Sequence, residues 1–365
     1  METEPSRTRR VEPGRARRGI PVGTNLLVAL LCVVANLYQY AVVPLALLPR
    51  GGAWAATLVP AAIMSLTHWA ILHESIHGHL HPNKRINVAL GRVLGVLFGV
   101  PFHTVRFGHL LHHRFTGTPT DRPEVYDPER SSRLVRAVAY YPNLLLGAYG
   151  SELAAAVLVL LPKARLARVA SRAFGKHDRG IGGGTRENAS RDGASRLAVN
   201  HLVNDRARRA ELRLDGALIV LLLFASAACY GRYWPILVLA LGARALLISF
   251  LDNAYHYGTP LGGPGSSLNL KPLLFPSCLI LDFNLHRAHH LRPALPWSSL
   301  RATLASTGDR YDGALPLAAL RQLRGPIPVH ALAAMQPCPG TQASPDAPRW
   351  RTAARPTHEL AAAAG

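Results

Sequence analysis

Residues 53–79 read AWAATLVPAAIMSLTHWAILHESIHGH, and this stretch decides the fold. Its first part, 53–72, contains no Asp, Glu, Lys or Arg and is long enough to cross about 30 Å of hydrocarbon. The apolar block ends directly in His73 and His77, which are four residues apart and therefore share one face of a helix. We predict a pair of metal-binding imidazoles at the end of a membrane span.

Three more apolar blocks surround this one in the sequence. Block 25–48 precedes it and is joined to it by the turn-forming residues Pro-Arg-Gly-Gly. Blocks 214–230 and 234–251 are separated by Gly-Arg-Tyr, which again leaves room only for a tight turn. The pattern predicts an all-α integral membrane protein with about four transmembrane helices in two hairpins. Both hairpins would return the chain to one side, where a histidine-rich cap would form.

The remaining segments are weaker membrane candidates. Segment 88–102 is short for a crossing, and we expect a helix packed against the domain or near the interface. Segment 137–161 contains Tyr-Tyr-Pro-Asn, two glycines and a glutamate, so we interpret it as interfacial or re-entrant. Segment 163–213 carries thirteen Lys/Arg against five Asp/Glu. We expect this basic insert to be poorly ordered. Because basic loops tend to stay on the cytoplasmic side, it also predicts that the cap is cytoplasmic.

Composition and charge limit the kinds of partner and the domain organisation that fit this sequence. Of the 365 residues, 49% are hydrophobic and the net charge is +20. Without a nucleic-acid-binding motif, basic residues beside apolar blocks favour an anionic membrane surface over nucleic acid. We predict a basic cytoplasmic tail at 1–24, a membrane domain at 25–305 and a partly disordered tail at 306–365. In a bacterium this would be the inner membrane.

Histidine spacing points to a metal centre. Nine histidines are candidate ligands: His73, His77, His109, His112, His113, His256, His286, His289 and His290. The eight in the three clusters exceed what one tetrahedral zinc ion uses, so two adjacent metal ions are expected. His256 follows the fourth apolar block, as His73 follows the second. We expect Asn253, Asp252 and His79 to be possible supporting residues that orient imidazoles or water.

These residues resemble the membrane fatty acid desaturase superfamily, which includes related hydroxylases and carotenoid ketolases. The shared features are HxxxH at 73–77, HxxHH at 109–113 and the run NLHRAHHLRPALPW at 284–297. The resemblance implies two non-haem iron ions and O2-dependent oxidation of lipid acyl chains, most simply fatty acid desaturation. It also implies a separate ferredoxin- or cytochrome-type electron donor, because the chain shows no fused HPGG motif.

Three alternatives stay open at this point. A hydroxylase or ketolase of carotenoid or another lipid would use the same histidines. The letters HESIH also match the HExxH pattern of an intramembrane zinc protease, with Glu74 as general base. That hypothesis leaves the two HxxHH clusters unexplained. A membrane scaffold that has lost catalysis would be expected to have lost ligands as well.

Overall fold

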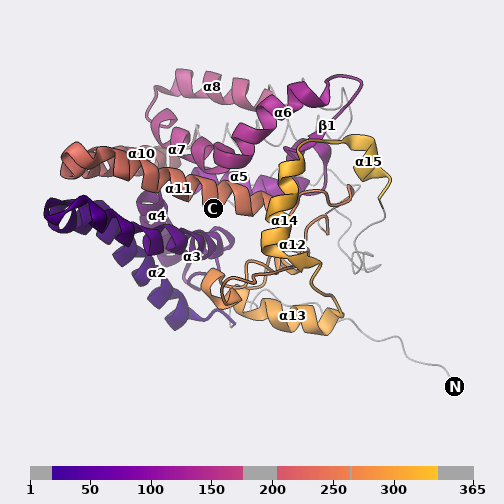
Figure 1. Ribbon diagram of the computed structural model, residues 1–365, viewed down its shortest axis with the longest axis horizontal. Helices are drawn as coiled ribbons and strands as arrows, with labels where there is room; N and C mark the ends of the chain where they lie inside the picture. Colours follow the sequence, from indigo (N-terminus) through magenta and orange to yellow (C-terminus); the bar gives the residue numbers. More distant parts are fainter. Residues whose placement is uncertain (1–18, 176–203, 264, 336–365) are drawn as a thin grey trace.

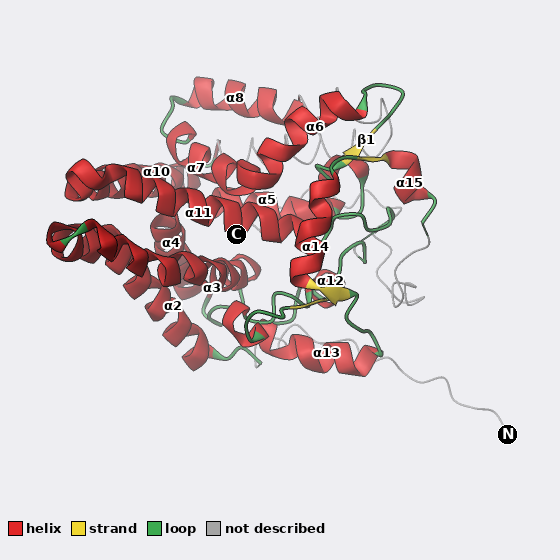
Figure 2. Ribbon diagram, in the orientation of Figure 1, coloured by secondary structure: helices red, strands yellow, loops and turns green. Residues whose placement is uncertain are grey.

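The computed structural model describes residues 19–175, 204–263 and 265–335, and these are mostly helical (Figure 2). Four two-residue strands form two parallel pairs, β1 (Val125–Tyr126) with β4 (Ile327–Pro328) and β2 (Leu270–Lys271) with β3 (Gly313–Ala314). The α-helices are α2 (Val22–Leu37), α3 (Leu58–His77), α4 (Lys84–Phe98), α5 (Phe102–Phe115), α6 (Arg133–Pro142), α7 (Ala148–Leu158), α8 (Lys163–Gly175), α10 (Arg206–Tyr230), α11 (Trp234–Ala254), α12 (His286–Leu291), α13 (Leu300–Thr307), α14 (Leu315–Arg321) and α15 (Val329–Ala333).

Three helical stretches are long and apolar enough to cross a membrane: Val22–Arg50, Gly52–His77 and Arg206–Ala254. The third folds back at Gly231, which has φ 51°, and so supplies two helices, α10 and α11. A Cβ on Gly52 would lie 3.9 Å from Tyr233, so the turns of both hairpins meet at one end, on the left of Figure 1. The predicted all-α membrane fold with about four spans in two hairpins is confirmed.

A buried arginine ties the hairpins together. Arg244 of α11 donates hydrogen bonds to Asn36 Oδ1 (2.9 Å) and Ser65 Oγ (3.2 Å), which belong to the first hairpin. It also donates to the carbonyl of Phe98 (3.2 Å), at the C-terminus of α4. A cation inside an apolar bundle is stable only when its donors are satisfied. Arg244 therefore fixes α2, α3, α4 and α11 to one another.

A sharp bend between α4 and α5 positions the second histidine cluster. Helices α4 and α5 meet at 99° across a three-residue break. Gly99 takes a left-handed conformation (φ 94°) and Pro101 precedes the first residue of α5. The hydroxyl of Tyr149 donates to the last carbonyl of α4. As expected, α4 is a short helix packed against the domain; the bend turns α5 towards the end of α3.

Segment 137–161 and the basic insert differ from simple loops. The first comprises α6, the π-helix η5 (Asn143–Gly147) and α7, packed against α10 and α11; it is not among the described stretches that meet the length and apolarity of a span. The expectation that 163–213 is poorly ordered is wrong at both ends. Helix α8 fills 163–175, and α10 begins at Arg206 with Asp205 capping its first amides. Residues 176–203 lie outside the described residues.

The C-terminal stretch 306–335 is part of the fold rather than a tail. Gln322 is fully buried, donates to the carbonyl of Phe250 (2.7 Å) and accepts from Asn253 (2.6 Å). Small residues Ala318 and Ala319 let α14 pack closely on α11. This stretch was expected to belong to the tail at 306–365, but its small side chains permit tight helix packing. The predicted tails beyond this core, 1–18 and 336–365, lie outside the described residues.

Candidate metal centre

All nine predicted histidines gather where the hairpins end. Helix α3 contributes two, α5 and α12 contribute three each, and His256 lies two residues beyond α11. Their ring nitrogens form two groups, each close enough to hold one ion. We call them site one and site two. Site one consists of His73, His77, His109, His113 and His289; site two consists of His112, His256, His286 and His290.

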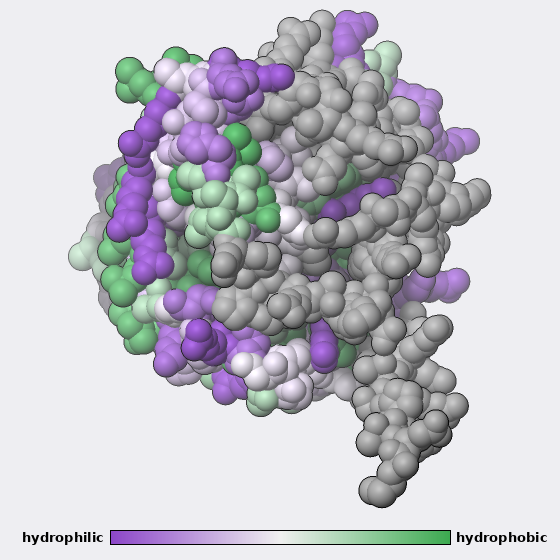
Figure 3. Space-filling view, turned by 90° about the vertical axis from the view of Figure 1, so that its right-hand side faces the viewer, coloured by the Kyte–Doolittle hydropathy of each residue, from purple (hydrophilic) through white to green (hydrophobic). Residues whose placement is uncertain are grey.

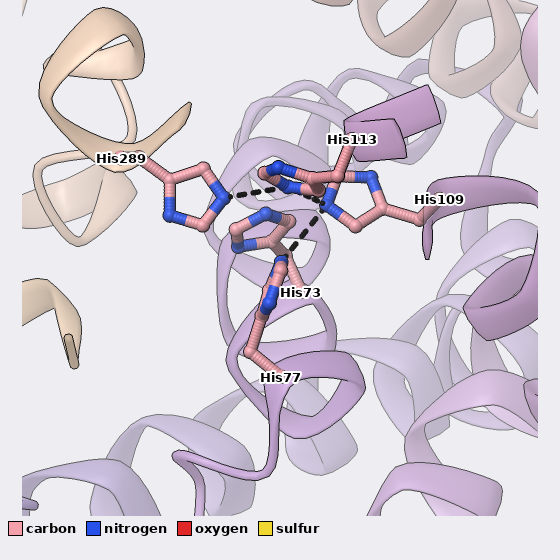
Figure 4. A group of neighbouring side chains, drawn as sticks. All are labelled: His73, His77, His109, His113 and His289. Atoms are coloured by element: carbon pink, nitrogen blue, oxygen red, sulfur yellow. Dashed lines mark hydrogen bonds between the residues drawn. The ribbon is translucent and has the colours of Figure 1, made fainter. Parts of the chain in front are cut away.

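In site one the imidazoles point to a common centre (Figure 4). His109 Nε2 lies 3.0 Å from His77 Nε2 and 2.9 Å from His113 Nε2. His113 Nε2 lies 3.0 Å from His289 Nε2. His73 completes the group, and its buried Nε2 has no hydrogen-bond partner in the described part of the chain. A buried nitrogen without a partner, aimed at four others, is what a metal ligand requires.

Site two shows why a cation belongs there. His256 Nδ1 lies 3.2 Å from the carbonyl oxygen of Ser266, and His112 Nδ1 lies 2.7 Å from Asp121 Oδ2. Both oxygens can only accept a hydrogen bond. Each Nδ1 therefore carries the hydrogen, and each Nε2 carries a lone pair. These two Nε2 atoms face each other at 3.1 Å. Two opposed lone pairs repel at this distance unless a positive ion lies between them.

The nitrogen spacing also indicates the coordination angle. In site two, His286 Nε2 is 3.0 Å from both His256 Nε2 and His290 Nε2. With metal–imidazole bonds of about 2.1 Å, that separation corresponds to an angle of about 90°, whereas a tetrahedral zinc ion would place the nitrogens about 3.4 Å apart. The spacing fits ions with octahedral-type angles and open positions, and imidazole donors suit iron, copper, nickel and zinc alike.

Each HxxHH cluster is divided between the two sites. In α5, the outer pair His109 and His113 belongs to site one while His112 belongs to site two. In α12 the division is reversed, with the outer pair in site two and His289 in site one. The rings of His113 and His290 stack at 4.3 Å where the sites adjoin. Both helices therefore hold both sites.

Burial keeps these imidazoles neutral. Burial and the neighbouring imidazoles lower the pKa of His289 to about 3. The pKa values of His256, His286 and His290 are also lowered, first by burial and then by charge repulsion from nearby histidines. A neutral imidazole keeps the lone pair that a metal needs. Both sites are therefore prepared for cations across the physiological pH range.

Three residues were expected to support the ligands, and a supporting role for them stays a prediction. Asn253 donates to Gln322, as described above. Asp252 Oδ1 accepts from Trp69 Nε1 at 3.2 Å. His79 stacks near His77, with ring centres 5.9 Å apart. None of the three contributes to either group of ligands in the described residues.

Two supporting contacts were not anticipated. Asp121, in a 3₁₀ turn after α5, orients His112 through Nδ1. Thr116 Oγ1 lies 3.3 Å from His290 Nδ1. In the sequence both residues belong to the polar segment RFTGTPTD at 114–121, which follows the second cluster as in the family that the chain resembles. That resemblance marks the segment, but it specifies no contact until the turn is known.

An ion-pair network holds α12, which carries the third histidine cluster, in place. Arg287, which is 1% exposed, pairs with Asp309 and with Asp312 (2.8 Å). Asn269 completes the network by donating to Asp309 (2.9 Å) and accepting from the backbone amide of Ala288 (3.2 Å). Residues from the supposed C-terminal tail thus fix the rotation of α12 and the direction of its three histidines.

An apolar pocket adjoins both sites. The ring of Phe283 lies 4.9 Å from His73 and 4.8 Å from His286, so it touches both sites and one wall of the pocket. Tyr255 stacks on His286 at 4.7 Å. The pocket runs between α3 and α11, and its lining includes Leu66, Trp69, Leu247, Leu251, Asp252 and Leu315. The lining is thus mostly apolar, and the space that it encloses is narrow.

Comparisons with known proteins agree with this geometry. Over 82 residues the chain is 30% identical to the Delta(12) fatty acid desaturases of Mortierella isabellina and Mortierella alpina. The match covers 22% of this chain and 20% of each relative, so it spans about a fifth of their length. No solved structure gives a significant match. The family model for fatty acid desaturases matches residues 52–314, which include all nine histidines, and the chain therefore belongs to the fatty acid desaturase family.

Proposed function

We propose that this membrane oxidoreductase binds two iron ions and uses O2 to desaturate lipid acyl chains, with electrons from a separate ferredoxin- or cytochrome-type donor. The observation that carries the proposal is the pair of all-imidazole sites in ring contact with an apolar pocket. Bound iron would supply O2 activation. The overall reaction removes two hydrogens from the chain, and two donor electrons with two protons complete the reduction of O2 to water.

The protein's own residues would do the rest. Nine imidazoles hold the ions, and Asp121 and Ser266 fix the tautomers of two of them. Leu251 and Phe283 surround an alkyl chain and exclude water from it. Trp69 and Asp252 close the pocket with a hydrogen bond between α3 and α11. An apolar chain gains about 0.8 kcal/mol for each methylene removed from water, enough to hold it without a specific polar contact.

We further propose that the sites face the cytoplasm. His103 of α5 lies 2.9 Å from Glu211 near the start of α10. The arginine-rich start of α10 is therefore at the same end of the bundle as the histidines. Basic segments beside spans are preferentially retained on the cytoplasmic side, which supports this orientation.

Lipid profiling tests the activity. The chain would be expressed in a host that supplies reductant, beside His289→Ala and the control His330→Ala, which changes an exposed histidine of α15. We expect new unsaturated acyl chains with the wild type and the control but not with His289→Ala, and about two irons per purified chain. Hydroxylated or ketonic products would instead assign oxygen insertion. One zinc per chain and unchanged lipids would refute the proposal.

A further inference from the structure

A group of exposed leucines stands on two segments that also line the apolar pocket. We call it the apolar rim; it consists of Leu273, Leu274 and Leu279 from the loop after β2, and Leu317 and Leu320 from α14. Leu274 is 81% exposed and Leu273 is 66% exposed. These segments lie outside the hairpins and would contact water if the cap were entirely extramembranous. Clustered exposed leucines indicate an interaction surface.

The rim lies at the level of the spans rather than beyond them. The carbonyl of Leu279 accepts a hydrogen bond from Thr67 Oγ1 at 2.6 Å. Thr67 precedes the end of the stretch Gly52–His77 by ten residues (77 − 67), which is about 15 Å along a helix. Helix α14 crosses the hairpin direction (Figure 1), and its Leu315 lines the pocket beside Leu247.

The loop is apolar towards the protein and towards the outside. Phe275 and Ile280 face the pocket, while Leu273 and Leu274 are exposed. Pro272 and Pro276, within the same loop, have no amide hydrogen to satisfy. The amides of Leu279, Leu281 and Asp282 bond to carbonyls inside the loop. Such a backbone tolerates poor hydration better than an ordinary loop does.

Basic side chains border the rim. Lys271 precedes the loop, Arg321 ends α14 and Arg324 follows it; all three are exposed. In the view onto the cap end, purple and green areas both lie at the surface beside the grey part (Figure 3). Exposed leucines flanked by Lys and Arg match the headgroup region of an anionic bilayer, where the apolar side chains enter the acyl layer.

We propose that the apolar rim is a bilayer-contact surface additional to the spans, seated in the headgroup region of an anionic membrane. It forms the lateral entrance through which an acyl chain passes from the bilayer into the pocket. The entrance role rests on the proposed function, whereas the bilayer contact does not. The substrate accordingly arrives from the plane of the membrane and not from the aqueous side of the cap.

Depth-dependent quenching tests the contact without any turnover. The protein, with Cys229, Cys278 and Cys338 changed to Ser, would be labelled at Leu274→Cys or at the control Ser306→Cys, an exposed position on α13. Nanodiscs of phosphatidylglycerol and phosphatidylcholine would carry lipids with a quencher near the headgroup. We expect at least twofold stronger quenching at 274 than at 306, and the same at Leu320→Cys. Equal quenching at all three positions would overturn the proposal.

The entrance role has its own measurement. The variant Leu274→Asp places a charge in the rim and leaves both metal sites untouched. We expect turnover of bilayer lipid to fall by about tenfold while iron content stays at the wild-type level. Unchanged turnover would overturn the entrance role. If the wild-type protein showed no activity, the proposed function would fail, but the quenching result would still test the bilayer contact.

Discussion

Replacing Asp121 should weaken one metal site selectively. Its carboxylate accepts the Nδ1 hydrogen of His112 at 2.7 Å, and His112 is a ligand of site two only. A carboxylate behind a ligating imidazole fixes the ring and raises its basicity, and removing such a partner typically lowers metal affinity 10- to 100-fold. Asp121→Asn keeps an acceptor of the same shape but removes the charge. We expect a loss near tenfold for Asn and near 100-fold for Asp121→Ala.

These factors correspond to about 1.4 and 2.7 kcal/mol of binding free energy. Iron would be withdrawn from purified protein with graded chelator, and the iron that remains per chain would be measured. Each variant should lose one ion at lower chelator concentration than the wild type while retaining the other. Asp127→Asn is the matched control, because Asp127 pairs with Arg130, which is 41% exposed. Wild-type retention of both ions in Asp121→Ala would refute the role assigned to this carboxylate.

Three further outcomes follow from the contacts described above. Arg287→Leu removes the arginine that pairs with Asp309 and Asp312, so the free energy of unfolding should fall by about 3–5 kcal/mol, measured by thermal unfolding. For Arg301→Leu, whose side chain is 59% exposed, the fall should be less than about 1 kcal/mol. Metal-free protein should lose stability as pH falls below about 6.5, because the buried histidines of site two have lowered pKa values and only the unfolded chain takes up protons there; a flat profile between pH 7 and pH 5 in denaturant titrations would contradict this. Leu251→Trp, which fills the pocket, should abolish lipid turnover with iron retained, unlike Leu246→Trp on the exposed side of α11.

Much of the fold was predictable because its signals are local. Apolar blocks separated by tight turns specify hairpins, and a block that ends in a histidine pair specifies where the ligands begin. The packing of 306–335 was not predictable in this way. Gln322 resembles any polar residue in an Ala-rich stretch, and only its bonds to Phe250 and Asn253 show that it is buried.

The ligands themselves were predictable from spacing, but their division between two sites was not. Residues i, i+3 and i+4 of a helix lie on one face, so periodicity alone groups His109, His112 and His113 together. Which of them meets which partner depends on the angle at which α5 approaches α3 and α12. The 99° bend before α5 sets that angle, and it combines the left-handed conformation of Gly99 with a hydrogen bond from the distant Tyr149.

The division of adjacent histidines between two sites fixes the distance between those sites. His112 and His113 are consecutive, as are His289 and His290, and each couple directs one ring to each site. The separation of the two ion positions is thus set by the rotation between successive helical residues, about 100°. A movement of the cap that admits a chain would carry both positions together. In the proposed function, access would then change during turnover while the spacing between the two sites stayed constant.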